Sequence, residues 1–134
     1  MARPEVPDAL AMRRLKYGVD VPPAERDRAA EKLRTLGRRA EAILLYERHA
    51  DHPSIRDDLT WAVKEGAAFH VFLLKRMGLE VTDASLRSCA EAAEAHSRWY
   101  DAHRCWNALK DEAGLARVAE RLPGYKPAVP ANKV

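Results

Sequence analysis

Apolar residues recur every three or four positions along most of this chain, the spacing that places them on one face of an α-helix. The clearest examples lie within residues 29–36 and 86–93. Ala, Arg, Glu and Leu dominate the sequence and β-branched residues are sparse, a composition that favours helices over strands. The pattern therefore predicts an all-α protein.

Breaking residues divide the pattern into about six to seven helices. Gly18, Gly37 and Gly78 follow the last apolar residue of a helical stretch, where glycine commonly ends a helix. Gly66 lies inside the stretch 54–77, which is interpreted as a hairpin with a tight turn near Gly66. One long helix is the alternative, because glycine inside a helix costs only about 1 kcal/mol. The predicted helices cover residues 9–17, 23–36, 38–50, 54–77, 83–96, 99–109 and 111–122.

At 134 residues the chain has the length of one domain. We expect a short N-terminal helix and linker over residues 1–22 and a helical domain over residues 23–122. Residues 123–134 contain prolines and few apolar anchors, so they are expected to form a flexible C-terminal tail.

Two stretches of the chain, sixty residues apart, carry the same pair of residue types. Ala42 is followed four residues later by Tyr46, and Ala102 is followed four residues later by Trp106. A small residue lets two helices approach closely, and a large ring one turn further along fills the space beside it. Recurrence of this kind indicates a helical-hairpin repeat, in which each hairpin covers the apolar face of the next.

On these residues the chain resembles a divergent tetratricopeptide-repeat protein over residues 23–122. The middle unit departs from the family pattern, with Val71 in place of the small residue and Lys75 in place of the ring. His49 and Leu109 stand where the family prefers alanine, and both good units lack the aromatic residue of the first helix. An irregular helical bundle is the alternative. The matching residues are Ala30, Leu33, Ala42, Tyr46 and Pro53 in the first unit and Ala90, Ala93, Trp99, Ala102 and Trp106 in the last.

The resemblance implies an array of antiparallel helical hairpins that acts as a non-catalytic protein–protein interaction module. Such a scaffold or adaptor would hold a peptide or helix of another protein on the first helices of its hairpins, with no catalytic residue, metal or cofactor. The candidate contacts are long polar residues on those helices, and the competing interpretation is that they only face solvent. They are Arg26, Lys32, Arg34, Arg87, Glu91 and Glu94.

Positive charge is concentrated in the first third of the chain. Residues 1–39 contain ten Lys and Arg against six Asp and Glu, whereas the remaining residues contain thirteen against fourteen. A basic stripe can bind nucleic acid, so a nucleic-acid-binding helical protein is the alternative function. Acidic residues interrupt the stripe and aromatic residues do not alternate with it, so a solvated helix face is favoured and nucleic acid is a disfavoured partner.

No targeting or membrane segment is evident in the sequence. No apolar stretch approaches the roughly 20 residues that a membrane span requires. The first residues lack the apolar core of a secretory signal. Together with two cysteines, this predicts a cytoplasmic protein with reduced thiols and no membrane partner.

Cys89, His96, His103 and Cys105 are the strongest candidates for a metal site. Zinc requires four N or S ligands in tetrahedral positions, but His103 and Cys105 point about 200° apart around one helix. Packed cysteines and surface histidines are therefore the favoured interpretation. A Cys89–Cys105 disulfide requires that their helices meet, and a reducing compartment disfavours it. His70 lies in an apolar stretch and is expected to be a packed core residue.

The remaining polar groups are interpreted as ordinary helix features. His49 and His52 lie near the end of the predicted helix 38–50, where exposed histidine is favoured. Ser54 is expected to cap the next helix. The pair Asp57–Asp58 follows it, and carboxylates near a helix start complement the helix dipole.

Overall fold

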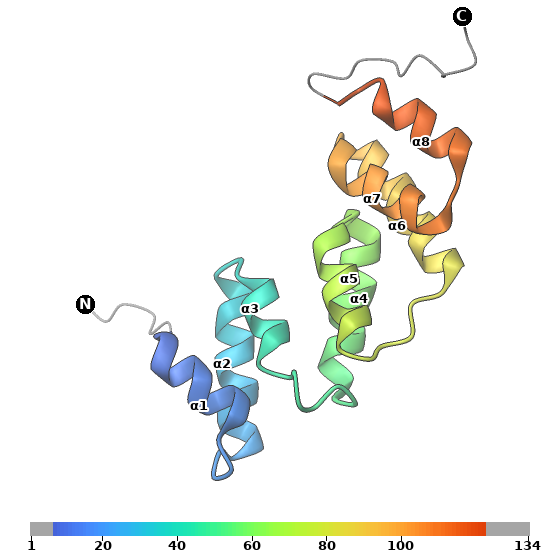
Figure 1. Ribbon diagram of the computed structural model, residues 1–134. Coiled ribbons are helices and arrows are strands. Elements are labelled where there is room, and N and C mark those ends of the chain that lie inside the picture. Colours follow the sequence, from blue (N-terminus) through green and yellow to red (C-terminus); the bar gives the residue numbers. More distant parts are fainter. Residues whose placement is uncertain (1–6, 123–134) are drawn as a thin grey trace, which may run out of the picture. The chain divides into compact units, whose positions relative to one another are not determined.

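The computed structural model describes residues 7–122, and their regular structure is entirely α-helical (Figure 1). These residues form eight helices rather than the predicted six to seven, because residues 54–77 form two helices. Within residues 7–122, no helix combines the length and the apolar character that crossing a bilayer demands. The predicted tail, residues 123–134, lies outside the described residues. The helices are α1 Ala9–Tyr17, α2 Pro23–Thr35, α3 Arg39–Leu44, α4 Pro53–Glu65, α5 Ala68–Arg76, α6 Asp83–Ala95, α7 Trp99–Leu109 and α8 Glu112–Ala119.

The chain divides into two compact units. The first unit contains Met1–Trp61 and His70–Glu80, and the second contains Ala62–Phe69 and Val81–Val134. Helices α1 to α3 therefore belong to the first unit and α6 to α8 belong to the second. Helices α4 and α5 contribute residues to both units.

Three helix pairs, α2–α3, α4–α5 and α6–α7, are each joined by a short turn, and the first turn illustrates their geometry. The amide of Arg38 donates to the carbonyl oxygen of Leu33 at 2.8 Å, and the amide of Gly37 donates to that of Arg34 at 3.0 Å. These bonds satisfy carbonyls that the end of α2 leaves without helical partners. Gly37 has a φ of 76°, which glycine adopts without steric cost, so the predicted helix end at Gly37 is confirmed.

The turn after α4 uses the same bonds and decides between the two interpretations of residues 54–77. The amide of Ala67 donates to the carbonyl oxygen of Ala62 at 2.9 Å, and Gly66 has a φ of 71°. The stretch is therefore two helices and not one. Gly66 also lies against α6, since a Cβ added to it would be 2.3 Å from the backbone nitrogen of Ala93.

The turn after α6 repeats the geometry without a glycine. The amide of Arg98 donates to the carbonyl oxygen of Ala93 at 2.8 Å, and Ser97 occupies the left-handed position with a φ of 58°. The predicted break near Ser97 is confirmed. At the other end of α6, the hydroxyl of Thr82 accepts a bond from the amide of Ser85, so Thr82 is the N-cap.

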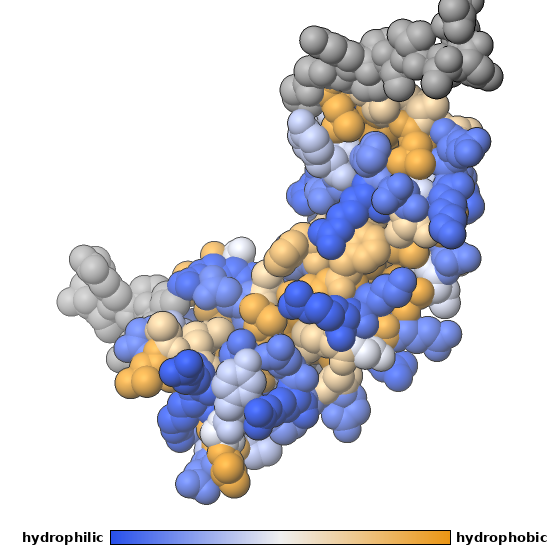
Figure 2. Space-filling model, viewed as in Figure 1, coloured by the Kyte–Doolittle hydropathy of each residue, from blue (hydrophilic) through white to orange (hydrophobic). Residues whose placement is uncertain are grey.

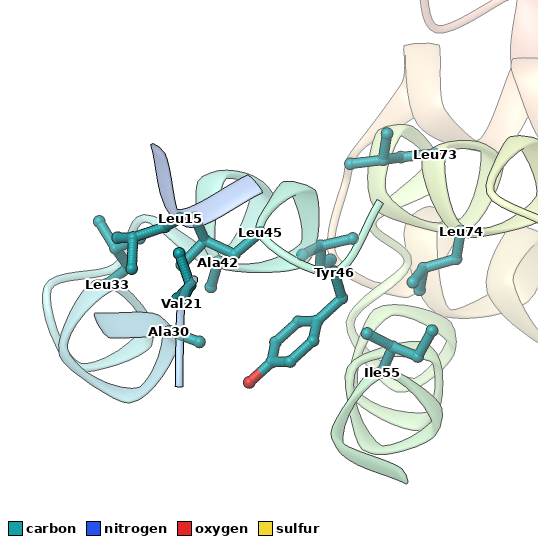
Figure 3. Packing of buried hydrophobic residues seen from close by; sticks show 11 residues of the cluster. Leu15, Val21, Ala30, Leu33, Ala42, Leu45, Tyr46, Ile55, Leu73 and Leu74 are labelled. Atoms are coloured by element: carbon teal, nitrogen blue, oxygen red, sulfur yellow. The ribbon is translucent and has the colours of Figure 1, made fainter. Parts of the chain in front are cut away.

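One apolar cluster forms the core of the first unit (Figure 3). Tyr46 is 1% exposed, and its side chain lies between residues of α2 and residues of α4 and α5. Ala42, one turn earlier, is fully buried. Burial of each large apolar side chain stabilises the fold by about 1.5–3 kcal/mol. The cluster comprises Leu15, Val21, Ala30, Leu33, Ala42, Ile43, Leu45, Tyr46, Ile55, Leu73 and Leu74.

Helix α3 is shorter than the predicted helix 38–50. It ends at Leu44, after which the amides of Leu45 and Tyr46 bond to carbonyls three residues back, at 3.2 and 3.0 Å. This tighter 3₁₀-type winding changes the direction of successive side chains. Both Leu45 and Tyr46 are consequently buried although they are adjacent in the sequence.

Helix α1 buries less of its apolar surface than its sequence predicts. Leu15 is 5% exposed and Met12 packs against the core, whereas Leu10 is 75% exposed and Tyr17 is 41% exposed. The hydroxyl of Tyr17 instead donates to the carboxylate of Glu47 at 2.8 Å. Asp8 caps the helix by accepting a bond from the amide of Ala11 at 2.8 Å.

The core of the second unit contains mainly small residues of α6 and α7, together with the ring of Trp106. The predicted apolar face of α6 within residues 86–93 is buried, and so are Ala102 and Trp106 on α7. The Trp106 ring lies against Gly114 of α8, where an added Cβ would come within 2.5 Å of a ring atom. Glycine at this position therefore allows α8 to approach α7.

Two glycines with similar φ angles provide a matched test of the contact between Gly66 and α6. An added Cβ at Gly37 meets no atom within 4 Å, so Gly37→Ala should lower the free energy of unfolding only by the left-handed strain of about 1–2 kcal/mol. Gly66→Ala carries the same strain and must also displace the backbone of α6, so it should cost about 1–3 kcal/mol more. Urea denaturation measures both variants. Equal losses would show that α4 does not end against α6.

Candidate functional site

A cleft lies between α1 and α2 in the first unit. The two helices meet near the loop that joins them and diverge toward the N-terminal end of α1 (Figure 1). Arg26 fixes the point where they meet, because its Nε donates to the carbonyl oxygen of Leu15 at 3.1 Å. Leu15 lies in the last turn of α1, where carbonyls lack helical partners, so the guanidinium supplies the missing donor.

Arg26 is consequently not the surface contact that the sequence analysis proposed. Its residue is only 6% exposed, and its guanidinium is engaged within the first unit. The helical spacing already contained a signal for this burial, because Arg26 precedes the buried residues Ala30 and Leu33 by four and seven positions. An arginine on the apolar face of a helix predicts an internal partner.

The cleft has a volume of about 920 Å³, in the upper part of the range of about 300–1,000 Å³ that is typical of ligand-binding clefts. Hydrophilic and hydrophobic residues are interspersed over this end of the molecule (Figure 2). Lys32, one of the predicted contact residues, lines the cleft. The full lining is Pro7, Asp8, Ala11, Arg14, Leu15, Glu25, Arg28, Ala29, Glu31, Lys32, Thr35 and Leu36.

The three carboxylates in the lining are already engaged within the protein. Arg14 Nη1 donates to Glu25 Oε1 at 2.6 Å, and this bond holds the pKa of Glu25 below its ordinary value. Glu31 lies 3.8 Å from the guanidinium of Arg34, and Asp8 caps α1. Their negative charges are therefore partly compensated.

Two cations in the lining remain available. Arg28 and Lys32 lie four residues apart on α2, so they occupy the same helix face. Neither has a carboxylate within ion-pair distance among residues 7–122. The lining charges without an ion pair among these residues are thus Arg28, Lys32 and the carboxylate of Asp8, which leaves an excess of one positive charge.

Most basic side chains of the stripe, by contrast, are engaged in ion pairs or hydrogen bonds inside the first unit. In the described part of residues 1–39, the basic residues without an ion pair or a buried acceptor are Arg13, Arg28 and Lys32. Few cations therefore remain to contact a phosphate backbone, the interaction that dominates nucleic-acid affinity. The engaged residues are Arg14, Lys16, Arg26, Arg34, Arg38 and Arg39.

Asp58 on α4 forms a buried cluster with two arginines, and the sequence analysis missed it. Its carboxylate is fully buried and accepts from Arg34 Nε and Nη2 at 2.9 and 2.7 Å and from Arg39 Nη1 at 2.8 Å. Arg34, proposed as a partner contact, is therefore committed to an internal ion pair. The signal for the cluster was the position of Asp58 three residues after the buried Ile55, on the apolar face of α4.

Aromatic rings flank this Arg–Asp cluster. The guanidinium of Arg39 lies 4.2 Å from the centroid of the Trp61 ring, and that of Arg34 lies 5.9 Å from the Tyr46 ring. The Trp61 ring in turn contacts His70 edge-on at 5.2 Å between centroids. These contacts fix both guanidinium planes, so the cluster is a structural element that connects α2 and α3 to α4 and α5.

His52 begins α4 rather than ending the helix before it. Its Nδ1 accepts from the amide of Ser54 at 3.2 Å, and its Nε2 lies 3.3 Å from Asp27. Ser54 is therefore inside the first turn of α4 and is not the N-cap that was predicted. The proline at 53 is the first helical residue, where its missing N–H costs nothing.

In the second unit, Glu94 is held by two neighbours. Trp106 Nε1 donates to Glu94 Oε2 at 2.8 Å, and Arg117 donates to both carboxylate oxygens at 2.8 Å. The bond from Arg117 holds the pKa of Glu94 below its ordinary value. With its side chain 18% exposed and its oxygens engaged, Glu94 is largely unavailable to a partner.

Arg87 and Glu91 are exposed on α6, as the sequence analysis assumed. Arg87 Nη1 lies 3.3 Å from Asp111 Oδ2, and its guanidinium lies 5.5 Å from the centroid of the Trp106 ring. Glu91 makes no hydrogen bond or ion pair within residues 7–122. The exposed members of the predicted set are thus Arg87 and Glu91 in the second unit, whereas Lys32 in the first unit is half-buried in the lining of the cleft.

The two cysteines are free thiols buried inside the second unit. Cys89 Sγ donates to the carbonyl oxygen of Ala62 at 3.9 Å. The hydrogen bond with Cys89, together with burial, raises the pKa of Cys105. Across residues 7–122, no three His, Cys, Asp or Glu side chains come together as metal ligands.

No family model, curated protein or solved structure matches this chain.

Removal of the Asp58 carboxylate should destabilise the first unit. Asp58→Asn leaves two partly buried guanidinium groups without their anion, which should lower the free energy of unfolding by about 3–5 kcal/mol. The neighbouring Asp57 is exposed and makes no hydrogen bond or ion pair within residues 7–122, so Asp57→Asn should change it by less than about 0.5 kcal/mol. Urea denaturation at neutral pH compares the two. Similar small effects would mean that the cluster is solvated.

Glu94 should make the second unit sensitive to acid. Its pKa is lowered in the folded state, so its contribution to stability is present above the ordinary glutamate value of 4.5 and is lost as the pH falls through the lowered pKa. Glu94→Gln should therefore be less stable than the wild type at neutral pH, and the difference should shrink below that value. Glu91→Gln serves as the control on the same helix. A difference that stays constant with pH would contradict the assignment.

Proposed function

We propose that the chain is a non-catalytic protein–protein interaction module built from helix pairs in the manner of tetratricopeptide repeats. The observation that carries this proposal is the recurrence of one turn geometry. The bonded carbonyls at the ends of α2, α4 and α6 belong to residues 33, 62 and 93, which are 29 and 31 residues apart. Regular recurrence of one helix-pair unit is the basis of helical-repeat proteins, which present extended surfaces to partners.

The packing positions after each turn also correspond. Nine residues after each bonded carbonyl stand Ala42, Val71 and Ala102, and all three are fully buried. The valine supports the inclusion of the middle pair, although it is not the small residue of the family pattern. Four residues further on, the middle pair has Lys75 where the others have Tyr46 and Trp106, so the middle pair is a divergent unit under this proposal.

The open cleft between α1 and α2 supports binding of a protein segment over binding of nucleic acid. Its lining mixes apolar residues with both signs of charge, which suits a peptide that buries apolar side chains and pairs a few charges. The same lining contains three carboxylates, those of Asp8, Glu25 and Glu31, which do not favour a polyanion. Nucleic-acid binding therefore stands as the weaker candidate function.

Peptide-display selection on the full chain tests the proposal. We expect random peptides of mixed apolar and charged composition to be enriched and to bind the folded chain, but not the heat-unfolded chain, with micromolar affinity by fluorescence anisotropy. Duplex DNA and single-stranded RNA should bind only weakly at physiological salt, about 0.15 M. Failure to enrich any peptide would refute the proposal. Tight oligonucleotide binding with a steep salt dependence would favour the alternative function.

A further inference from the structure

We propose that the α1–α2 cleft binds a short amphipathic helix of another protein that carries acidic residues beside its apolar face. This inference rests on the proposed function and specifies where the partner binds and what chemistry it presents.

The cleft has the dimensions of a short helical segment. Helix α1 has nine residues and α2 has thirteen, so the walls are about 13 and 20 Å long at 1.5 Å per residue. Because Arg26 holds α2 to the carbonyl of Leu15 at one end, the helices are fixed there and open at the other end. A guest of about two to three helical turns matches the length of these walls.

The walls suit a helix with one apolar side. Ala11 of α1 and Ala29 of α2 both line the cleft, and small residues on both walls allow a third helix to approach closely. Leu36, at the open end, is 39% exposed and offers an apolar contact that α1 does not cover. An apolar stripe on the guest would bury this surface in the manner of helix-in-groove recognition.

The charge of the cleft selects acidic residues on the guest. The carboxylates of Glu25 and Glu31 already face Arg14 and Arg34, whereas Arg28 and Lys32 have no carboxylate within ion-pair distance among residues 7–122. These two cations lie one helical turn apart, so carboxylates three or four residues apart on a guest helix would face them. Two cations one turn apart match a pair of carboxylates on a peptide rather than a continuous run of phosphates, which makes a peptide the better complement.

A designed peptide tests the assignment on the full chain. The probe is a fluorescein-labelled helix of about 16 residues, since shorter isolated helices are marginal in water. It carries leucines on one face, pairs of Glu four residues apart beside them and Ala elsewhere, and a second peptide replaces each Glu with Lys. Anisotropy at about 0.15 M salt should detect the acidic peptide and show at least about tenfold weaker binding of the basic one.

Two double variants of equal charge change locate the binding surface. Arg28→Glu with Lys32→Glu should weaken binding of the acidic peptide by about tenfold or more and strengthen binding of the basic peptide. Arg13→Glu with Arg56→Glu alters two exposed arginines outside the cleft lining and should change either affinity by less than about twofold. Circular dichroism must show that both variants remain folded.

Several outcomes would overturn the inference. Equal effects of the two double variants would place binding outside the cleft. Displacement of the acidic peptide by an oligonucleotide would identify the wrong class of partner. Binding seen only after deletion of residues 2–6 would assign the cleft to the chain's own N-terminal segment. If display-selected peptides bind but are insensitive to Arg28→Glu with Lys32→Glu, the interaction module stands and the cleft assignment fails; if no peptide binds at all, the proposed function fails as well.

Discussion

The organisation of both units depends on how the carbonyl groups at the end of a helix obtain hydrogen bonds. After α2, α4 and α6, an amide beyond a left-handed residue bonds back to the helix, and the chain can then reverse without leaving those carbonyls unpaired. Gly66 and Gly37 adopt this conformation at no steric cost, whereas Ser97 must accept some strain. After each of these turns the residue nine positions beyond the bonded carbonyl, Ala42, Val71 or Ala102, is fully buried.

A second constraint is that many charged side chains are used inside the protein. Arg26 replaces a missing backbone donor at the end of α1, and Asp58 joins Arg34 to Arg39 within the first unit. Such buried groups are weak sources of net stability but are costly to leave unpaired, so they restrict how the helices pack. They also leave the surface of the first unit less basic than its sequence suggests, and among residues 7–122 Arg28 and Lys32 are two of the few basic residues of this unit without an ion pair.

Local signals in the sequence predicted the helices well, and they failed where partners were distant in the chain. Gly37 and the Ala42–Tyr46 spacing act through neighbouring residues, so the helix end and the buried ring were both predicted. Asp58 depends on arginines 19 and 24 residues away, and no local pattern states that they meet. For the same reason Arg34 and Glu94 were assigned to a surface, whereas Arg87 and Glu91 are exposed. Arg26 differs, because its place on the apolar face of α2 already indicated burial. The α1–α2 cleft was not predicted, because it arises from the angle between two helices.

The two buried cysteines allow local opening of the second unit to be measured from the reactivity of their thiols. Cys89 and Cys105 are fully buried free thiols, so an alkylating reagent reaches them only when the packing around α6 and α7 opens. The rate at which the two thiols are alkylated therefore measures how often that packing opens, and the measurement requires no introduced label. A ligand that stabilises the packing of these helices would lower the alkylation rate, whereas a ligand that acts elsewhere would leave the rate unchanged.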